Sequence, residues 1–388
     1  MKILVFGGWF GSRNLGDDAI LIGLREILHQ ALPDVEIVAF SSEPEYTMRV
    51  CGVGAVPTRS PRSMLRGDAA AAGAASYLSA FNEADACLVS GGTPVYDYGH
   101  LTRGFYFSFP RLLGKQLFCF GIGAKPIRSR TGRQLIRLLL RQTCLISTRD
   151  EPSRAILEGV GVGKPIKVTG DSSLFMEPLD PEAGLRRLAQ SGIDVTGPMV
   201  AICPRVLSTD YRSHYHEELT ADAISNTRLA VARAADHLAE EGYEVVFIPM
   251  HTVPPDDDRR EIEAITGLMR RGEPRVVEGG LLPQEAMAIL GLMELVVGLR
   301  LHSLILAAAQ GVPVVTVDYD SKIRGFMELA GVGDLACRSG DKPEVLIDRV
   351  YRALTEGSEL RRRLRRSCEE MRNRIMEEAR RVAAALGR

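Results

Sequence analysis

The first 28 residues, MKILVFGGWFGSRNLGDDAILIGLREIL (1–28), decide the expected fold. An apolar run at 2–6 stops at Gly7-Gly8. A second apolar set then follows at the spacing of one helix face, and its members are Ile20, Leu21, Leu24, Ile27 and Leu28. A strand that turns through glycines into a helix is the first half of a βαβ unit. The chain is therefore expected to begin as a parallel α/β protein.

The same alternation of short apolar runs and longer amphipathic stretches continues along the chain. It predicts an α/β protein with two doubly wound, Rossmann-like sheets. The strands expected in the first sheet are 2–6, 35–40, 86–90, 116–120, 144–148 and 166–168. Those expected in the second sheet are 199–204, 244–249, 275–277, 294–298 and 312–317. A polar, proline-containing segment at 177–181 is interpreted as the linker between domains of residues 1–178 and 179–388.

Length and composition exclude several classes of protein. The 388 residues suit two domains at about 100–200 residues each, and no stretch approaches the ~18 uncharged apolar residues of a membrane span. The N-terminus reads as a strand rather than a signal peptide, so we expect a cytoplasmic protein. A net charge of −1 provides no general attraction to nucleic acid, so no nucleic-acid partner is expected.

The seven cysteines are scattered, odd in number and never spaced C-x-x-C. This pattern argues against both a disulfide framework and a zinc site. We expect them to be small core residues in a reducing compartment.

The C-terminal segment is strongly basic and mixed with glutamate. Its arginines are Arg361, Arg362, Arg363, Arg365, Arg366, Arg372, Arg374, Arg380 and Arg381. We interpret it as a solvated helix face with Glu–Arg pairs four residues apart. The alternative is peripheral contact with an anionic membrane surface that carries a lipid-linked substrate.

Cations and histidines follow several of the predicted strands. They are Arg149, Arg205, His251, Arg300, His302 and Lys322. In open parallel sheets, ligands bind beyond the carboxyl ends of the strands. The accumulation of these residues on one predicted edge indicates an anion site.

Glycines take the corresponding positions in the N-terminal domain, where Gly91-Gly92 follow the strand at 86–90. The loop 7–18 lacks the G-x-G-x-x-G spacing of a dinucleotide site. Asp17 or Asp18 is a plausible N-cap for the helix that follows. The functional alternative is that Gly16, Gly91 and Gly92 let the backbone approach a sugar or its phosphate, with one of the two aspartates left to bind or deprotonate a hydroxyl.

Arg300 and His302 open a predicted helix directly after a buried strand. The amides of a first helical turn favour an anion, and the planar Arg300 fork suits carboxylate or phosphate. His302 is either a proton donor near neutral pH or a capping and packing residue. Lys322 opens another predicted helix against its dipole, which either a bound anion or plain solvent exposure would explain.

The segment HTVPPDDD (251–258) has three consecutive aspartates after His251. Adjacent aspartates cannot all face one ion, so we expect no metal site here. Asp256 is placed to cap the next helix, and His251 remains a candidate ligand contact.

Five motifs together resemble the polysaccharide pyruvyl transferase family. They are N-L-G-D-D-A-I-L at 14–21, G-I-G at 121–123, T-R-D-E-P-S at 148–153, G-L-R-L-H at 298–302 and D-Y-D-S-K-I-R-G-F at 318–326. The resemblance spans most of the chain and is closest to the cell-wall branch typified by the CsaB protein. R-L-H followed by Y-D-x-K is its most specific part.

The resemblance implies a GT-B-like architecture, with two Rossmann-like domains facing a central cleft. It implies transfer of pyruvate from phosphoenolpyruvate, as a ketal, onto two hydroxyls of one sugar with release of inorganic phosphate. Phosphoenolpyruvate is then a co-substrate, and no further cofactor is implied. In the cell-wall branch the acceptor is an N-acetylmannosamine unit of a lipid-linked polymer, and the product anchors surface-layer proteins.

Under this resemblance several cations must converge on phosphoenolpyruvate, which carries close to three negative charges. The available set is Arg149, Arg205, Arg300, His302 and Lys322. We hypothesise that His302 protonates the enol methylene, that Arg300 and Lys322 hold the phosphate or carboxylate, and that Asp17 or Asp18 acts on the acceptor hydroxyl. The family has G-D-E where this chain has Gly16-Asp17-Asp18, so the choice between the two aspartates stays open.

Two other functions fit the same pattern. A GT-B glycosyltransferase that uses a nucleotide sugar also needs cations, for a diphosphate. A non-catalytic sugar-phosphate sensor would need the cations but no change in the protonation of His302.

Overall fold

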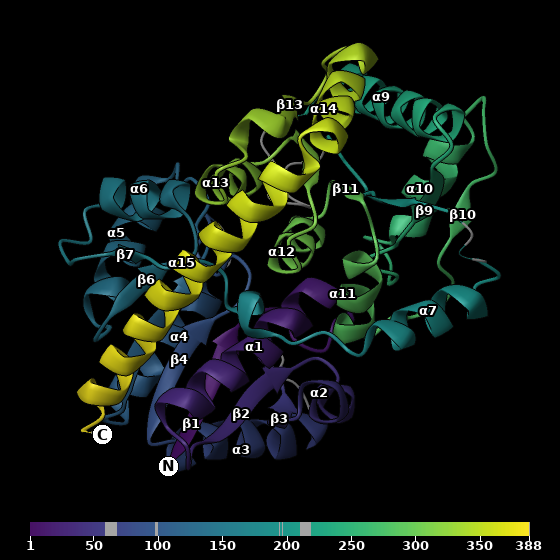
Figure 1. Ribbon diagram of the computed structural model, residues 1–388. Coiled ribbons are helices and arrows are strands. Elements are labelled where there is room, and N and C mark those ends of the chain that lie inside the picture. Colours follow the sequence, from purple (N-terminus) through teal and green to yellow (C-terminus); the bar gives the residue numbers. More distant parts are fainter. Residues whose placement is uncertain (59–67, 98–99, 194, 196, 210–218, 388) are drawn as a thin grey trace. The chain divides into compact units, whose positions relative to one another are not determined.

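The computed structural model describes residues 1–58, 68–97, 100–193, 195, 197–209 and 219–387 (Figure 1). Contacts between residues divide the chain into two compact units. Unit 1 comprises Met1–Arg13, Asp17–Met176 and Met371–Arg388, and unit 2 comprises Asn14–Gly16 and Glu177–Glu370. Each unit is built on one parallel sheet with helices, so the predicted α/β class is confirmed.

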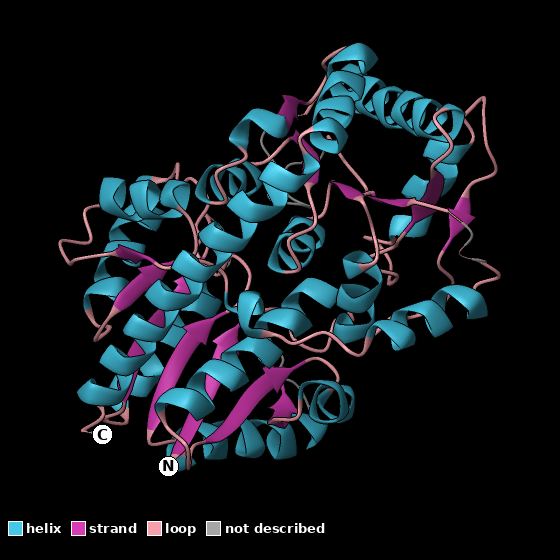
Figure 2. Ribbon diagram, in the orientation of Figure 1, coloured by secondary structure: helices cyan, strands magenta, loops and turns pink. Residues whose placement is uncertain are grey.

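Unit 1 contains a seven-stranded sheet in the order β3-β2-β1-β4-β5-β6-β7, and every pairing is parallel (Figure 2). Its strands are β1 (Lys2–Gly7), β2 (Glu36–Ser41), β3 (Gly54–Pro57), β4 (Ala86–Ser90), β5 (Gln116–Ile122), β6 (Ile146–Thr148) and β7 (Lys167–Val168). The six predicted strands are present. The sequence analysis missed β3, whose residues GAVP include the glycine and proline that strands usually avoid.

Helices cover both faces of this sheet. They are α1 (Leu15–Ala31), α2 (Pro44–Cys51), α3 (Asp68–Glu83), α4 (His100–Leu112), α5 (Arg130–Arg141), α6 (Glu151–Val160) and the 3₁₀ turn η2 (Ser172–Phe175). Side chains of α3 to α6 share one core cluster with the strands, for example Phe81, Phe107, Ile136 and Leu157. The step from β1 to β2 runs across the sheet in the direction opposite to the steps from β4 to β5 and β6. A right-handed crossover therefore places α1 on the sheet face opposite to α4 and α5.

Unit 2 contains a six-stranded parallel sheet in the order β10-β9-β8-β11-β12-β13. Its strands are β8 (Met199–Cys203), β9 (Glu244–Phe247), β10 (Arg275–Val276), β11 (Leu295–Gly298), β12 (Val314–Asp318) and β13 (Ala336–Arg338). Its helices are α7 (Pro181–Gln190), α9 (Ala221–Glu240), α10 (Asp258–Thr266), α11 (Pro283–Gly291), α12 (Leu301–Ala309), α13 (Ser321–Leu329), η3 (Gly333–Leu335) and α14 (Pro343–Thr355). The short edge strand β13 was not predicted.

The last helix, α15 (Gly357–Ala385, yellow in Figure 1), has a continuous buried stripe. The stripe consists of Leu360, Leu364, Cys368, Met371, Ile375, Ala379 and Val382, each at most 1% exposed. The predicted domain of 179–388 differs from the compact units here, because residues from Met371 onward belong to unit 1. Arg372 donates to the carbonyl oxygen of Leu174 at 2.9 Å, and the Met371 side chain lies against Gly170.

Several arginines of α15 pair with glutamates of the same helix. The pairs include Arg362–Glu359, Arg366–Glu370 and Arg381–Glu378. The solvated face predicted from the sequence is therefore what the structure contains. In the part of the chain that the structure describes, no helix is long and apolar enough to cross a membrane.

All seven cysteines are free thiols in the structure. Six are buried, as expected of small core residues. Cys144 is exposed, so the expectation is wrong for that residue.

Replacing Ile375 by alanine should destabilise unit 1, because the side chain is fully buried in the stripe of α15. A large-to-small change at such a position costs about 2–5 kcal/mol. The free energy of unfolding, measured by denaturant titration, checks this. Asn373→Ala on the exposed face of the same helix is the control and should change it by less than about 0.5 kcal/mol. Equal effects of the two changes would contradict the assignment of the stripe.

Candidate active site

Four adjacent strands of the six-stranded sheet end at cations and histidines. Strands β9, β8, β11 and β12 are neighbours and run parallel. The residues that follow these strands are His251 after β9, Arg205 after β8, Arg300 and His302 after β11, and Lys322 after β12. The structure thus brings five of the six predicted residues to one carboxyl edge. Arg149 follows β6 of the seven-stranded sheet, so the expectation of one shared edge is wrong for that residue.

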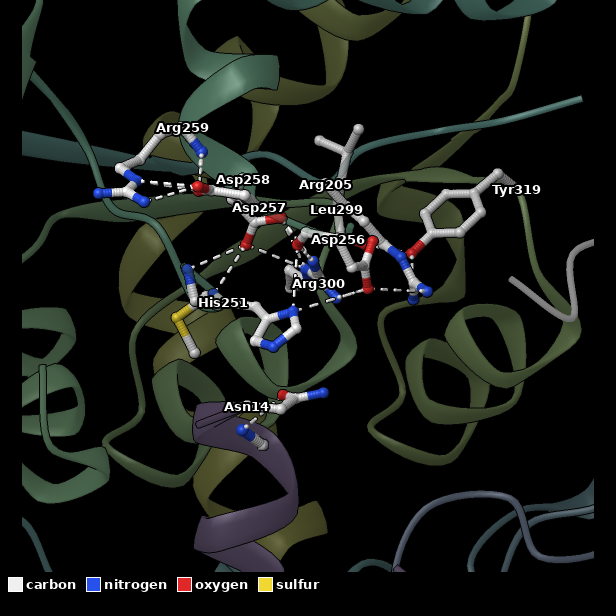
Figure 3. Close-up of polar contacts among 12 residues, drawn as sticks. Asn14, Arg205, His251, Asp256, Asp257, Asp258, Arg259, Leu299, Arg300 and Tyr319 are labelled. Atoms are coloured by element: carbon white, nitrogen blue, oxygen red, sulfur yellow. Dashed lines mark hydrogen bonds and ion pairs between the residues drawn. The ribbon is translucent and has the colours of Figure 1, made fainter. Parts of the chain in front are cut away.

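Arg300 lies at the centre of a buried ion-pair network in unit 2 (Figure 3). Its Nε atom donates to both carboxylate oxygens of Asp258 at 3.0 Å, and its Nη2 atom lies 2.5 Å from Oδ1. Its Nη1 atom donates to Oδ2 of Asp256 at 3.0 Å, and Nη2 also donates to the Asp256 carbonyl oxygen at 2.9 Å. The sequence suggested that the guanidinium group of Arg300 binds an anionic ligand. In the structure this group binds Asp256 and Asp258 instead.

The three consecutive aspartates have three different structural roles. Asp257 is the N-cap of α10 and accepts from the backbone N–H of Arg259, so the prediction that Asp256 is the cap is wrong. Asp258 is fully buried and also accepts from the backbone N–H groups of Met250 and His251. Among the described residues, no group of three or more His, Cys, Asp or Glu is placed to hold a metal ion.

Asp256 faces three basic side chains. Its Oδ2 atom lies 3.0 Å from Arg300 Nη1, 3.8 Å from His251 Nδ1 and 3.9 Å from Arg205 Nη2. Burial by itself raises the pKa of Asp256, but the hydrogen bond from His251 and the charges of Arg300 and Arg205 outweigh burial and hold that pKa well below its usual range. Asp256 is therefore ionised near neutral pH.

The network is electrically balanced before any ligand arrives. Burial opposes the charge of Arg300, yet Asp258 and Asp256 raise the pKa of Arg300 above its usual value. Two guanidinium groups, Arg205 and Arg300, thus face two carboxylates. The sequence analysis counted the cations but did not foresee these counter-ions.

His251 is held in one tautomer. Its Nδ1 atom lies 3.1 Å from the carbonyl oxygen of Asp256, and because a carbonyl only accepts, Nδ1 carries the proton. The ring lies between the aspartate cluster and Asn14 in Figure 3. Asn14 forms a β-bridge with His251, and Leu15 donates its N–H to the Met250 carbonyl oxygen at 3.2 Å. In the neutral ring, Nε2 is then the atom able to accept a proton.

His302 is the second residue of α12 and packs directly on Gly16. A Cβ atom added to Gly16 would lie 2.0 Å from Nδ1 of His302, which is far too close for any side chain. The sequence predicted Gly16 as a substrate contact, whereas in the structure its missing side chain makes room for the imidazole. His302 is half-buried and does not cap α12, because Arg300 occupies the N-cap position.

Lys322 and Arg205 complete the edge. Lys322 Nζ lies 3.6 Å from Oδ2 of Asp320, the buried N-cap of α13, so this carboxylate explains a cation in the first turn. Arg205 lies over the Tyr319 ring at 5.9 Å, and its Nη1 donates to the Tyr319 hydroxyl oxygen at 3.4 Å. Tyr319 in turn donates to the carbonyl oxygen of Leu299 at 2.5 Å. In the sequence, Tyr319 stands out only as part of the motif at 318–326.

In unit 1 the structure separates the two candidate aspartates. Asp18 is fully buried and accepts from the Tyr46 hydroxyl at 3.0 Å, a packing role. Asp17 accepts from the backbone N–H of Trp9 at 3.3 Å and lies beside Gly92. Neither is the N-cap of α1, because Asn14 holds that position and accepts from the Gly16 N–H at 3.1 Å. Asp17 is thus the aspartate that lies at the glycine loop.

Gly91 and Gly92 both have positive φ angles, 91° and 53°. A Cβ atom on Gly91 would lie 2.9 Å from the Cα atom of Gly8. Gly91 therefore lets the loops after β1 and β4 approach each other, and a Cβ atom on Gly92 would lie 3.1 Å from Oδ1 of Asp17.

Arg149 is a second buried arginine, and it has its own counter-ions in unit 1. Its Nε donates to Asp150 at 3.2 Å, Nη1 lies 3.7 Å from Asp171, and Nη2 donates to the Thr93 hydroxyl at 3.2 Å. Lys125, which sequence analysis overlooked, is also buried and only 7% exposed. Lys125 could have been found from the sequence, because it lies three residues after the end of β5.

An aromatic cavity of about 370 Å³ adjoins the glycine loop of unit 1. Its lining includes Gly7, Gly8, Trp9, Phe10, Tyr96 and Tyr106. Trp9, the only tryptophan in the chain, is 61% exposed. The sequence analysis did not predict this cavity, since its rings come from separate segments.

Replacing Arg300 by methionine should lower the free energy of unfolding by about 3–5 kcal/mol, because it leaves the buried Asp258 carboxylate without its partner. The double variant Arg300→Met/Asp258→Asn should lose less than the sum of the two single changes, since it also removes the stranded charge. Denaturant titration of all three variants measures this coupling. Arg366→Met, at a side chain 82% exposed on α15, is the control and should have little effect. Strict additivity at Arg300 and Asp258 would contradict the network.

Comparison with solved structures identifies the fold. A glycosyltransferase from Rickettsia africae superposes with a TM-score of 0.61 at 9% identity, covering 99% of this chain and 98% of that chain. The UDP-GlcNAc 2-epimerase from Neisseria meningitidis, bound to UDP-GlcNAc, gives a TM-score of 0.57 at 13% identity, covering 97% and 100%. At such identities the likeness shows the fold alone. The predicted GT-B type of fold is confirmed.

Comparison of sequences identifies the family. The amylovoran biosynthesis protein AmsJ of Erwinia amylovora is 24% identical over 374 residues, which cover 87% of this chain and 88% of that protein. Residues 14–321 match the model of the polysaccharide pyruvyl transferase family. That range begins within the glycine loop, includes Arg149, Arg205, His251, Arg300 and His302, and ends one residue before Lys322. The chain belongs to the polysaccharide pyruvyl transferase family.

Proposed function

We propose that this transferase moves pyruvate from phosphoenolpyruvate onto a sugar of a cell-wall or surface polysaccharide, forming a ketal and releasing inorganic phosphate. The observation that supports this most is the meeting of Arg205, Lys322 and His302 at one carboxyl edge. Phosphoenolpyruvate carries close to three negative charges on a small frame, and such an anion needs several cations. Arg205 and Lys322 are proposed to supply the lasting positive charge.

The reaction requires two sugar hydroxyls to add to C2 of phosphoenolpyruvate. The two hydroxyls lose two protons in total. The methylene carbon gains one proton and becomes the methyl group. The phosphate departs with its bridging oxygen and gains the other proton. We assign the delivery of the proton to His302, which Gly16 allows to sit in one place at the start of α12. His251, with Nδ1 committed to the Asp256 carbonyl, is suited to accept a hydroxyl proton at Nε2.

Arg300 takes a different role from the one expected from its sequence. Its donors hold Asp256 and Asp258, and Asp258 also fixes the backbone before His251. We therefore propose Arg300 as a positioning residue that keeps His251 and His302 in place.

We assign the binding of the acceptor sugar to unit 1, because of the side chains found there. Asp17 and the aromatic cavity beside it offer a carboxylate for a hydroxyl and ring faces for a sugar. A lipid-linked glycan precursor, an N-acetylmannosamine acceptor and the cell-wall CsaB branch remain predictions from the resemblance. A cytoplasmic location remains a prediction from the N-terminal sequence.

A reaction with defined donors tests the proposal. The protein is incubated with phosphoenolpyruvate and candidate acceptor sugars, and phosphate release is measured beside hydrolysis or transfer of UDP sugars. We expect phosphate release that depends on the acceptor, together with a melting temperature raised by phosphoenolpyruvate, which at ~100 times its dissociation constant adds about 2.7 kcal/mol. No response to phosphoenolpyruvate with clear turnover of a UDP sugar would favour a glycosyltransferase. Binding without turnover of either donor would favour a sensor.

The contact between Gly16 and His302 provides a second test. Gly16→Ala should reduce turnover by about 10²–10⁴, the usual contribution of a positioned general acid, because the new methyl group displaces the imidazole. His302→Asn should reduce turnover by a similar factor while binding of phosphoenolpyruvate is less affected. Gly159→Ala, at a helical glycine with no atom within 4 Å of the added Cβ, is the matched control. Full activity of His302→Asn would exclude His302 as the acid.

A further inference from the structure

The segment between Asp97 and Asp150 has an unusual charge balance. These 52 residues contain ten Lys and Arg and no Asp or Glu, although the whole chain has a net charge of −1. Such an excess of one sign creates a local positive field. The segment includes α4, β5 and α5 of unit 1.

Two of these cations, Lys125 and Arg149, are buried near the strand ends, but others form a stripe on the surface. Arg130, Arg133, Arg137 and Arg141 recur on α5 at spacings of three and four residues, and all four are exposed. Residues at this spacing lie on one helix face. α5 therefore presents a continuous basic stripe.

The stripe borders two highly exposed leucines. Leu112, at the end of α4, is 79% exposed, and Leu138 of α5 is 59% exposed. Both line a shallow surface groove of about 680 Å³ together with Arg111 and Arg141. The groove thus combines apolar side chains with guanidinium groups from α4 and α5.

The basic stripe of α5 differs from the basic face of α15. On α15, Arg362 and Arg366 pair with glutamates three or four residues away. α5 contains no acidic residue and so has no such partner within the helix. The adjacent helix α6 has Glu151 and Glu158, and both lie within ion-pair distance of its own Arg154.

We propose that α5 and the end of α4, with the groove between them, dock on an anionic lipid surface. Anionic head groups match the arginine stripe, each basic residue near such a surface contributing about 1 kcal/mol. Leu112 and Leu138 insert into the boundary between head groups and acyl chains, as apolar side chains of interfacial helices do. This surface replaces α15 as the place of membrane contact, and the proposal is independent of the reaction that the protein catalyses.

Vesicle flotation tests the proposal with the full chain. Vesicles of phosphatidylcholine alone are compared with vesicles that also contain phosphatidylglycerol, at low and high salt. We expect binding only to the phosphatidylglycerol vesicles, and release at high salt because exposed charges are screened. Absence of binding at low salt would overturn the proposal.

Variants locate the surface. Arg130→Gln/Arg137→Gln should weaken partitioning about 30-fold, since two basic residues are lost. Leu112→Ser/Leu138→Ser should also weaken it. Arg362→Gln/Arg366→Gln removes the same charge from positions on α15 that are also exposed, and should leave partitioning unchanged. Circular dichroism and melting temperature verify folding of each variant.

Three results would contradict the assignment. Equal losses in the α5 and α15 variants would show only a general effect of net charge. Loss in the α15 variant alone would return membrane contact to α15. Unchanged lipid binding in the leucine variant, with heparin bound as tightly as the vesicles, would identify a surface for polyanions in general.

Discussion

The ion pair between Arg300 and Asp258 is the interaction on which the candidate active site depends. It joins the start of α12, which follows β11, to the start of α10, whose preceding loop follows β9. Both partners are almost completely buried, so losing either one would strand a charge in the interior. Asp258 also accepts from the backbone of Met250 and His251. The Asp258 carboxylate therefore holds both segments that carry the histidines, the one before His251 and the one before His302.

The network also explains why the cations at this edge are not equivalent. Arg300 is committed to Asp256 and Asp258, whereas Arg205 and Lys322 each have a carboxylate at a longer distance, 3.9 and 3.6 Å. Charge-assisted hydrogen bonds at about 2.7–2.9 Å are much stronger than such longer contacts. An incoming anion competes more easily for Arg205 and Lys322 than for Arg300.

Much of the fold and part of the site follow from the sequence. Apolar β-branched runs predict eleven of the strands, because buried parallel strands require them, and the residues after those runs locate the carboxyl edge. The short strands β3 and β13 lack such runs. The counter-ions could not be predicted, because Asp258 and Arg300 are 42 positions apart in the sequence and meet only in the folded chain. The caps by Asn14 and Asp257 depend on where the helix begins, which a pattern locates only to within a few residues.

The role of Gly16 shows the same limit at one residue. The sequence marks a glycine near two aspartates, and a substrate contact is a reasonable hypothesis for it. Only the folded chain shows that His302, far away in the sequence, occupies the space of the missing side chain. The GT-B fold itself supports many reactions, so function depends on such individual contacts rather than on the fold.

A crystal structure of the protein with phosphoenolpyruvate tests the account most directly. The account predicts the ligand at the carboxyl edge of the six-stranded sheet, with Arg205, Lys322 and His302 in contact with it and Arg300 still bound to both oxygens of Asp258. A structure in which Arg300 leaves Asp258 to bind the phosphate, or in which the ligand binds elsewhere, would contradict it.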